Sequence, residues 1–148
     1  MSNLIRKTED DLDDLINYVN SCKINEGNLY DKLVNTFNDL GALFNNFIKD
    51  PNNEKDKYKN ACVSLCNAFK HQKEINYDYK NLRIIEYGTT INCVLDAPFG
   101  DVIYFKNSDI LKKLSDSRNY EWYFKMFEGK RLDIVLLKIK EIVGDLNE

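Results

Sequence analysis

The sequence predicts a mainly α-helical bundle with a short three-stranded antiparallel β-meander inserted before the last helices. Apolar residues recur every three or four positions over residues 8–73 and again over residues 131–146. Between them, residues 82–106 are rich in β-branched and aromatic side chains that alternate with polar ones. The chain of 148 residues contains no repeat and no linker, so we expect one domain, 1–148.

The N-terminal half is expected to hold three helices, at about residues 8–23, 28–49 and 54–73. Thr8 is a candidate N-cap for the first helix, because acidic residues follow it and favour the positive end of the helix dipole. Asn28 is the corresponding candidate for the second helix. Pro51 separates the second helix from the third, because proline lacks a backbone donor and disfavours helix in the preceding residue.

The C-terminal half is expected to begin with the meander at about 82–106, in which Gly88 and the segment APFGD separate the strands. Helices are then expected at about 109–116, 118–128 and 131–146. In the last helix Ile134 and Leu137 fall outside the main apolar stripe. Such a helix is either central in the fold or shared with a second subunit.

Composition limits the class of protein. The net charge of −3 gives no strong field toward nucleic acid, so any RNA contact must be local, for example at the small basic cluster of Lys70, Lys73, Lys80 and Arg83. No apolar run reaches the roughly 20 residues of a membrane span, and we expect a cytoplasmic protein. Four cysteines without a CxxC pair are typical of reduced thiols, and no cofactor is implied.

One segment combines residues that could carry chemistry. The third helix ends in LCNAFKH, residues 65–71, which includes the only histidine of the chain, His71. Asn67 lies one helical turn before it, where its amide can orient the imidazole or bind a phosphate oxygen. A histidine gives and takes protons near neutral pH. The same residue at a helix end is also a common cap with no catalytic role.

This segment resembles the RNxxxH signature of HEPN domains, helical proteins of prokaryotic RNA cleavage and defence. Asn67 and His71 match the signature, whereas Cys66 stands where that family has arginine. The resemblance implies a homodimer in which the third helices approach each other, so that both His71 side chains face a common groove and cut RNA without a metal. Arginine would hold the phosphate as a bidentate cation, and cysteine lacks that charge. Lys70 and Lys73 remain as the candidate RNA-binding residues.

We expect one of two functions, of which the first is implied by the resemblance to HEPN domains and the second needs no catalytic residue. The first is an RNA-directed, HEPN-like protein of a prokaryotic defence or toxin–antitoxin (phage-defence) system, either a metal-independent endoribonuclease or an inactive relative. Its partners would be a second copy, RNA and a cognate antitoxin or defence protein, with no membrane. The second is a noncatalytic dimeric module that binds a protein through a strand edge of the meander.

Overall fold

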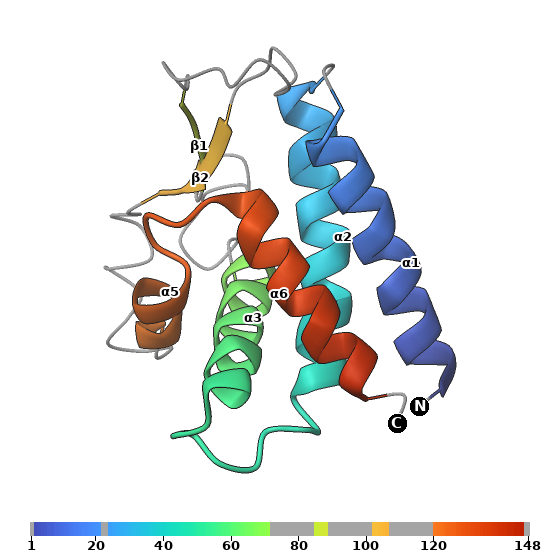
Figure 1. Cartoon of the computed structure of the whole chain (residues 1–148), viewed down its shortest axis with the longest axis vertical. Coiled ribbons are helices and arrows are strands. Elements are labelled where there is room, and N and C mark those ends of the chain that lie inside the picture. The colour runs from blue at the N-terminus through green and yellow to red at the C-terminus, as the bar shows by residue number, and fades with distance from the viewer. Residues whose placement is uncertain (1, 22–23, 72–84, 89–101, 107–119, 147–148) are drawn as a thin grey trace.

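The computed structural model describes residues 2–21, 24–71, 85–88, 102–106 and 120–146 (Figure 1). These residues are mainly α-helical, as predicted. The described helices are α1 (Ser2–Val19), α2 (Glu26–Phe44), α3 (Glu54–Lys70), α5 (Glu121–Met126) and α6 (Leu132–Asp145). Two short strands are β1 (Ile85–Gly88) and β2 (Val102–Phe105). No helix among the described residues is long and apolar enough to span a membrane.

Helix α1 begins six residues before the predicted start, and the prediction of Thr8 as its N-cap is wrong. Thr8 is fully buried inside the helix, where its hydroxyl donates to the carbonyl oxygen of Leu4 at 2.7 Å. Buried Ile5 extends the apolar stripe of the helix toward its N-terminus. A threonine hydroxyl can also donate to a carbonyl oxygen in the preceding turn, so threonine is compatible with the interior of a helix. A threonine before acidic residues therefore does not by itself mark the start of a helix.

Helix α2 is capped by Asn25, and the prediction of Asn28 as its cap is wrong. The Asn25 side chain accepts a hydrogen bond from the backbone N–H of Asn28 at 3.1 Å. This is the capping bond that an N-cap residue makes with the residue three positions after it. The helix ends at Phe44, before the predicted end near 49. Helix α3 starts at the predicted residue, with Asn53 as its N-cap, and ends at Lys70, three residues before the predicted end at 73, with His71 as its C-cap.

The described strands do not form the predicted three-stranded meander. Strand β1 pairs antiparallel with β2, so the first predicted strand lies directly beside the third. The predicted middle strand, around residues 89–95, lies outside the described residues. The register puts Ile85 opposite Phe105, and both side chains are buried. Alternation in the sequence identifies these strands but not their partners, because pairing depends on which faces meet the helices.

Two of the three helices predicted for the C-terminal part lie among the described residues, α5 (Glu121–Met126) and α6 (Leu132–Asp145). The helix expected at 109–116 lies outside the described residues, and α5 occupies only the centre of the segment expected at 118–128. After α5 the chain turns at Gly129, whose φ of 77° suits a residue without a Cβ. The Gly129 N–H donates to the carbonyl oxygen of Phe105 at 2.8 Å, which ties this turn to β2. Helix α6 matches the predicted bounds within one residue.

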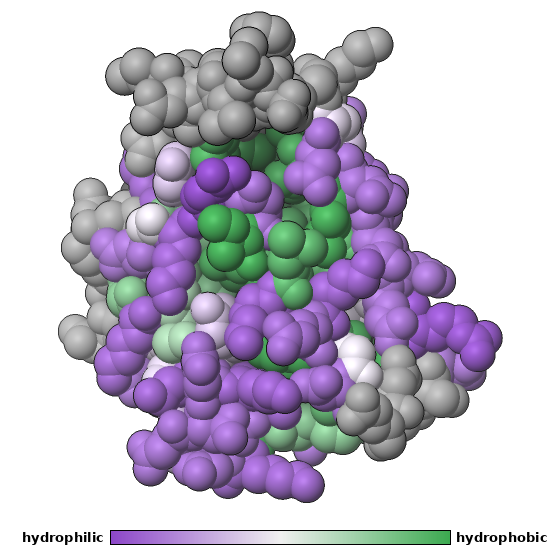
Figure 2. Space-filling view, viewed as in Figure 1, coloured by the Kyte–Doolittle hydropathy of each residue, from purple (hydrophilic) through white to green (hydrophobic). Residues whose placement is uncertain are grey.

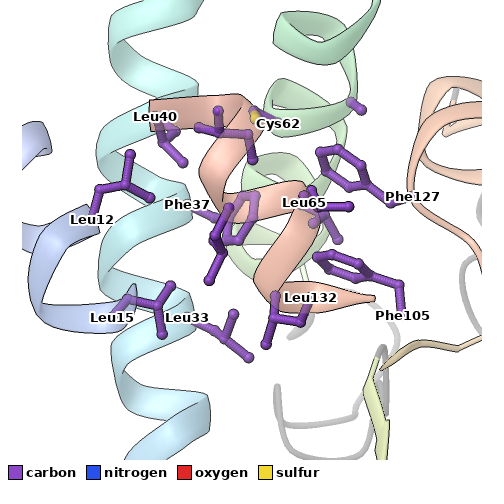
Figure 3. Close-up of a cluster of buried hydrophobic side chains, with 14 of the residues drawn as sticks. Leu12, Leu15, Leu33, Phe37, Leu40, Cys62, Leu65, Phe105, Phe127 and Leu132 are labelled. Carbon is purple, nitrogen blue, oxygen red and sulfur yellow. The ribbon is translucent and has the colours of Figure 1, made fainter. Parts of the chain in front are cut away.

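The core lies where α6 crosses the layer formed by α1, α2 and α3 (Figure 1). Helix α2 packs against both α1 and α3, while α5 packs against α3 and α6 against α1. Aromatic rings from three elements meet in this core: Phe37 of α2 lies edge-on to Phe105 of β2 and to Phe127, which follows α5, with ring centroids 6.4 and 6.1 Å apart (Figure 3). The short strands are thereby joined to the helical layer by apolar packing.

Candidate functional site

The C-terminal end of α3 carries the residues of the HEPN-like segment. The backbone N–H of His71 donates to the carbonyl oxygen of Asn67 at 2.9 Å, and His71 then leaves the helical conformation at φ −99° and ψ 8°. The imidazole is therefore attached at the point where the chain departs from the helix. Histidine at this position can also complement the negative end of the helix dipole.

Three of the predicted site residues share this last turn. Asn67 and His71 are partly exposed and Lys70 is exposed, so all three side chains have access to solvent. Lys73, the other predicted RNA-binding residue, lies outside the described residues. Within the described part of the chain, the helix end thus carries an amide, an ammonium group and an imidazole on one turn.

Cys66, at the position of the family arginine, is a packing residue. It is 2% exposed and lies against Gly41 of α2. A Cβ atom added to Gly41 would lie 2.3 Å from the Cys66 Cβ and 2.4 Å from its Sγ, so any side chain at position 41 would clash with Cys66. The thiol points at Asn38, whose Oδ1 lies 3.7 Å from Sγ. A longer side chain at position 66 would displace Asn38 or separate the helices.

The chemistry of Cys66 fits this packing role. Burial raises the pKa of the Cys66 thiol, and the nearby ammonium group of Lys70 offsets only part of the rise. Burial also raises the pKa of Cys62, one turn earlier in α3. Both cysteines are therefore neutral thiols at pH 7, which are weak nucleophiles and weak metal ligands.

A second polar cluster joins α1 to α2 and was not predicted from the sequence. The Nζ atom of Lys7 lies 2.8 Å from Oδ1 of Asp39 and 3.7 Å from Oδ2 of Asp11. The protonated Asp11 carboxyl donates a hydrogen bond to the Asp39 carboxylate, and this bond, together with burial, raises the pKa of Asp11 to about 6. The four-residue spacing of Lys7 and Asp11 is visible in the sequence, but nothing local places Asp39 beside them.

The two clusters meet at adjacent residues of α2. Asn38 accepts a weak hydrogen bond from the Cys66 thiol on α3, whereas Asp39 faces Lys7 and Asp11 on α1. Asp39 is close enough to Cys66 to contribute to the raised pKa of the thiol. This polar layer fixes α2 between its neighbours, and perturbed carboxyl groups of this kind occur in structural ion-pair networks as well as in active sites.

A third feature is an apolar surface over α6. Ile134 is 58% exposed and Leu137 is 57% exposed, as expected from residues outside the main stripe of this helix. Figure 2 shows hydrophobic surface near the centre of this face with hydrophilic residues around it. Large apolar side chains that share a helix face and remain in water indicate an interaction surface.

Metal chemistry has no visible support in the described residues, which contain no group of three or more potential metal ligands. No family model, curated protein or solved structure matches the chain.

Proposed function

We infer that this protein is a noncatalytic helical interaction module, comparable to a HEPN domain that has lost its catalytic arginine. The burial of Cys66 against Gly41 carries this proposal. Metal-independent cleavage of RNA by a histidine and an arginine needs a permanent positive charge beside the phosphate, in addition to proton transfer by the imidazole. A buried neutral thiol supplies no such charge.

The neighbouring lysine does not replace the missing group. Lys70 is exposed on the turn after Cys66. Its ammonium group is a flexible point charge and cannot bind a phosphate in the planar, bidentate way that a guanidinium does. The apolar surface of α6 supports the other half of the proposal, since Ile134 and Leu137 contribute nothing to the core while exposed to water. A module that binds proteins accounts for both features.

A cleavage assay tests the absence of catalysis. The wild-type protein, His71→Ala and Lys70→Arg are incubated with single-stranded and structured RNA in EDTA. Lys70→Arg places a guanidinium at the end of α3 and leaves the residue at position 66 unchanged. We expect indistinguishable product patterns from all three proteins. Metal-free cleavage by the wild type that disappears in His71→Ala would overturn the proposal.

A direct test at position 66 uses Cys66→Arg. Because the site is packed against Gly41, we expect this substitution to lower the melting temperature rather than create cleavage. Cys66→Ala is the matched control, because it removes the sulfur atom and adds no bulk. A Cys66→Arg protein that melts like Cys66→Ala and cuts RNA in a His71-dependent manner would restore the enzyme hypothesis.

A second candidate function is RNA binding in a prokaryotic defence or toxin–antitoxin system, and the shared exposure of Asn67, Lys70 and His71 favours it. Fluorescence anisotropy with single-stranded RNA at low salt tests it. Binding at this end of α3 predicts that Lys70→Glu weakens the complex several-fold, while Lys57→Glu, earlier on the same helix, has little effect. Equal loss in both variants would indicate nonspecific electrostatic attraction only.

A further inference from the structure

The exposed face of α6 has a charge at each end. Ile134, Leu137 and Glu141 follow one another at intervals of three and four residues, so they lie along one side of the helix, and all three are exposed. Lys130, which is also exposed, precedes the N-cap residue Arg131 and lies beside the N-terminal end of the helix. The exposed surface of α6 therefore has a positive charge beside its N-terminal end, two apolar side chains in the middle and a negative charge toward its C-terminal end.

This order is complementary to itself when reversed. If two copies of α6 lie antiparallel across a two-fold axis, Ile134 of each copy meets Leu137 of the other, and each Lys130 approaches the partner's Glu141. A parallel pair would instead bring the two Lys130 groups together and the two Glu141 groups together. Charge thus selects one orientation of a second copy of this chain.

The charged groups are available for such contacts. Glu141 has a loose intrahelical ion pair with Lys138 at 3.8 Å, and the Lys130 ammonium lies 5.8 Å from the ring centroid of Tyr58. Both are exposed interactions of low strength. Lys140, which lies on another side of the helix, is bound to Asp13 of α1 at 2.7 Å and does not compete for Glu141.

We propose that the protein forms a two-fold homodimer through antiparallel pairing of α6, with Ile134 and Leu137 in the contact and a Lys130–Glu141 pair at each end. This inference rests on the proposed function and names a second copy as the protein that the module binds. One helix face of this length buries less than the roughly 1,200 Å² of a standard interface, so the expected Kd is on the order of 10–100 µM.

Sedimentation analysis of the full chain from about 5 to 500 µM in low salt tests the pairing. The wild type is expected to shift from monomer to dimer over this range, and Leu137→Glu is expected to remain monomeric. Asn35→Glu introduces the same charge at an exposed position of α2 and should dimerise like the wild type. Circular dichroism confirms that each variant is folded. A wild type that stays monomeric at 500 µM, or a dimer that Leu137→Glu leaves intact, overturns the proposal.

Charge exchange tests the orientation. Lys130→Glu and Glu141→Lys each place like charges at both ends of the antiparallel pair and should weaken the homodimer about tenfold at low salt. The double variant, and an equimolar mixture of the two single variants, should recover affinity to within about threefold of the wild type. Single variants that dimerise normally, or that fail to complement each other, exclude this arrangement.

The outcomes separate the two proposals. A monomeric protein that leaves RNA intact overturns the α6 pairing and leaves the noncatalytic assignment in place. Metal-free, His71-dependent cleavage overturns the noncatalytic assignment whether or not the dimer forms.

Discussion

Gly41 allows α2 and α3 to approach each other at Cys66. Alanine is normally the better helix former by about 1 kcal/mol. Here its Cβ would lie 2.3 Å from the Cβ of Cys66, so the added carbon must force the helices apart. We therefore expect Gly41→Ala to lower the free energy of unfolding by about 1–3 kcal/mol in urea denaturation.

Gly144 provides the matched control for this prediction. It also lies in a helix, but no atom comes within 4 Å of a Cβ added there, so Gly144→Ala should be neutral or slightly stabilising. If the two variants are equally stable, the contact between Gly41 and Cys66 is not tight.

Asp11 is the residue whose protonation should be visible near neutral pH. Its pKa is raised from 3.8 to about 6 by the hydrogen bond that its protonated carboxyl donates to Asp39 and by burial. The folded protein therefore retains a proton on Asp11 between about pH 4 and 6 that the unfolded chain has released. The stabilisation of the folded protein by protonated Asp11 is fully present below about pH 4 and is lost as the pH rises through 6.

Asp11→Asn keeps a neutral hydrogen-bonding group at this position. Relative to the wild type, the variant should gain stability as the pH rises from 4 to 6 and keep a constant advantage above about pH 7. Urea unfolding at a series of pH values measures this difference, with Asp10→Asn, an exposed neighbour on α1, as the control. A difference between wild type and variant that does not change with pH would contradict the assigned proton.

At the scale of elements, Asp56 holds the start of α3 against the loop that follows α2. Its Oδ2 accepts hydrogen bonds from the backbone N–H groups of Lys49 and Asp50, at 3.0 and 2.7 Å. Its Oδ1 lies 3.0 Å from Nζ of Lys59. Burial by itself raises the pKa of Asp56, but these donors outweigh it and the pKa lies below the ordinary value of 3.8.

Asp56→Asn should therefore cost about 1–3 kcal/mol at pH 7, since it removes the charge that these donors satisfy. Because the pKa is lowered, the contribution of Asp56 exists above about pH 4 and disappears as the pH falls through the folded-state value. The gap between wild type and Asp56→Asn should narrow in acid. Glu54→Gln, exposed in the same first turn, should show neither effect.

Helix α6 offers a comparison between adjacent leucines. Leu136 is fully buried and Leu137 is 57% exposed. Leu136→Ala should lower the free energy of unfolding by about 2–5 kcal/mol, because it leaves a cavity in the core. Leu137→Ala should change the stability of the monomer by less than about 1 kcal/mol in dilute protein. Similar losses in both variants would mean that this face of α6 is covered within the monomer.

The helices could be predicted from the sequence because their signals are local. The apolar spacing of α6 predicted both ends of the helix within one residue. The same pattern placed Ile134 and Leu137 outside the stripe that packs in the core, and both are exposed. Caps were harder, since Thr8 and Asn28 have the right side chains in the wrong places, and only the hydrogen bonds distinguish them from Asn25. Strand partners could not be predicted, because register depends on distant packing.

The site was predictable only in part, for the same reason. The spacing of Asn67, Lys70 and His71 correctly placed them on one turn at the end of a helix. Cys66 is buried against Gly41, which lies 25 residues earlier in the chain. This tertiary contact could not be predicted from the motif. The polar contact of Asp39 with Lys7 and Asp11 is of the same kind.

For the whole molecule, the α6 pairing makes stability depend on concentration. A dimer that forms only from folded chains stabilises them by mass action. Between about 5 and 500 µM we expect the wild-type melting temperature to rise by a few degrees, while that of Leu137→Glu stays constant. Differential scanning calorimetry at the two concentrations measures the shift. An equal rise in both proteins would assign the association to another surface.

The single tryptophan, Trp122, makes α5 an optical reporter of how the two halves of the chain unfold. It is partly buried on a helix that packs against α3, and the Lys125 ammonium lies 4.9 Å from its ring centroid. Its fluorescence therefore follows the release of the C-terminal segment, whereas far-ultraviolet circular dichroism is dominated by α1, α2 and α3. Coincident transitions would identify one cooperative unit. An earlier fluorescence transition would mean that the N-terminal helices keep their structure after α5 has detached.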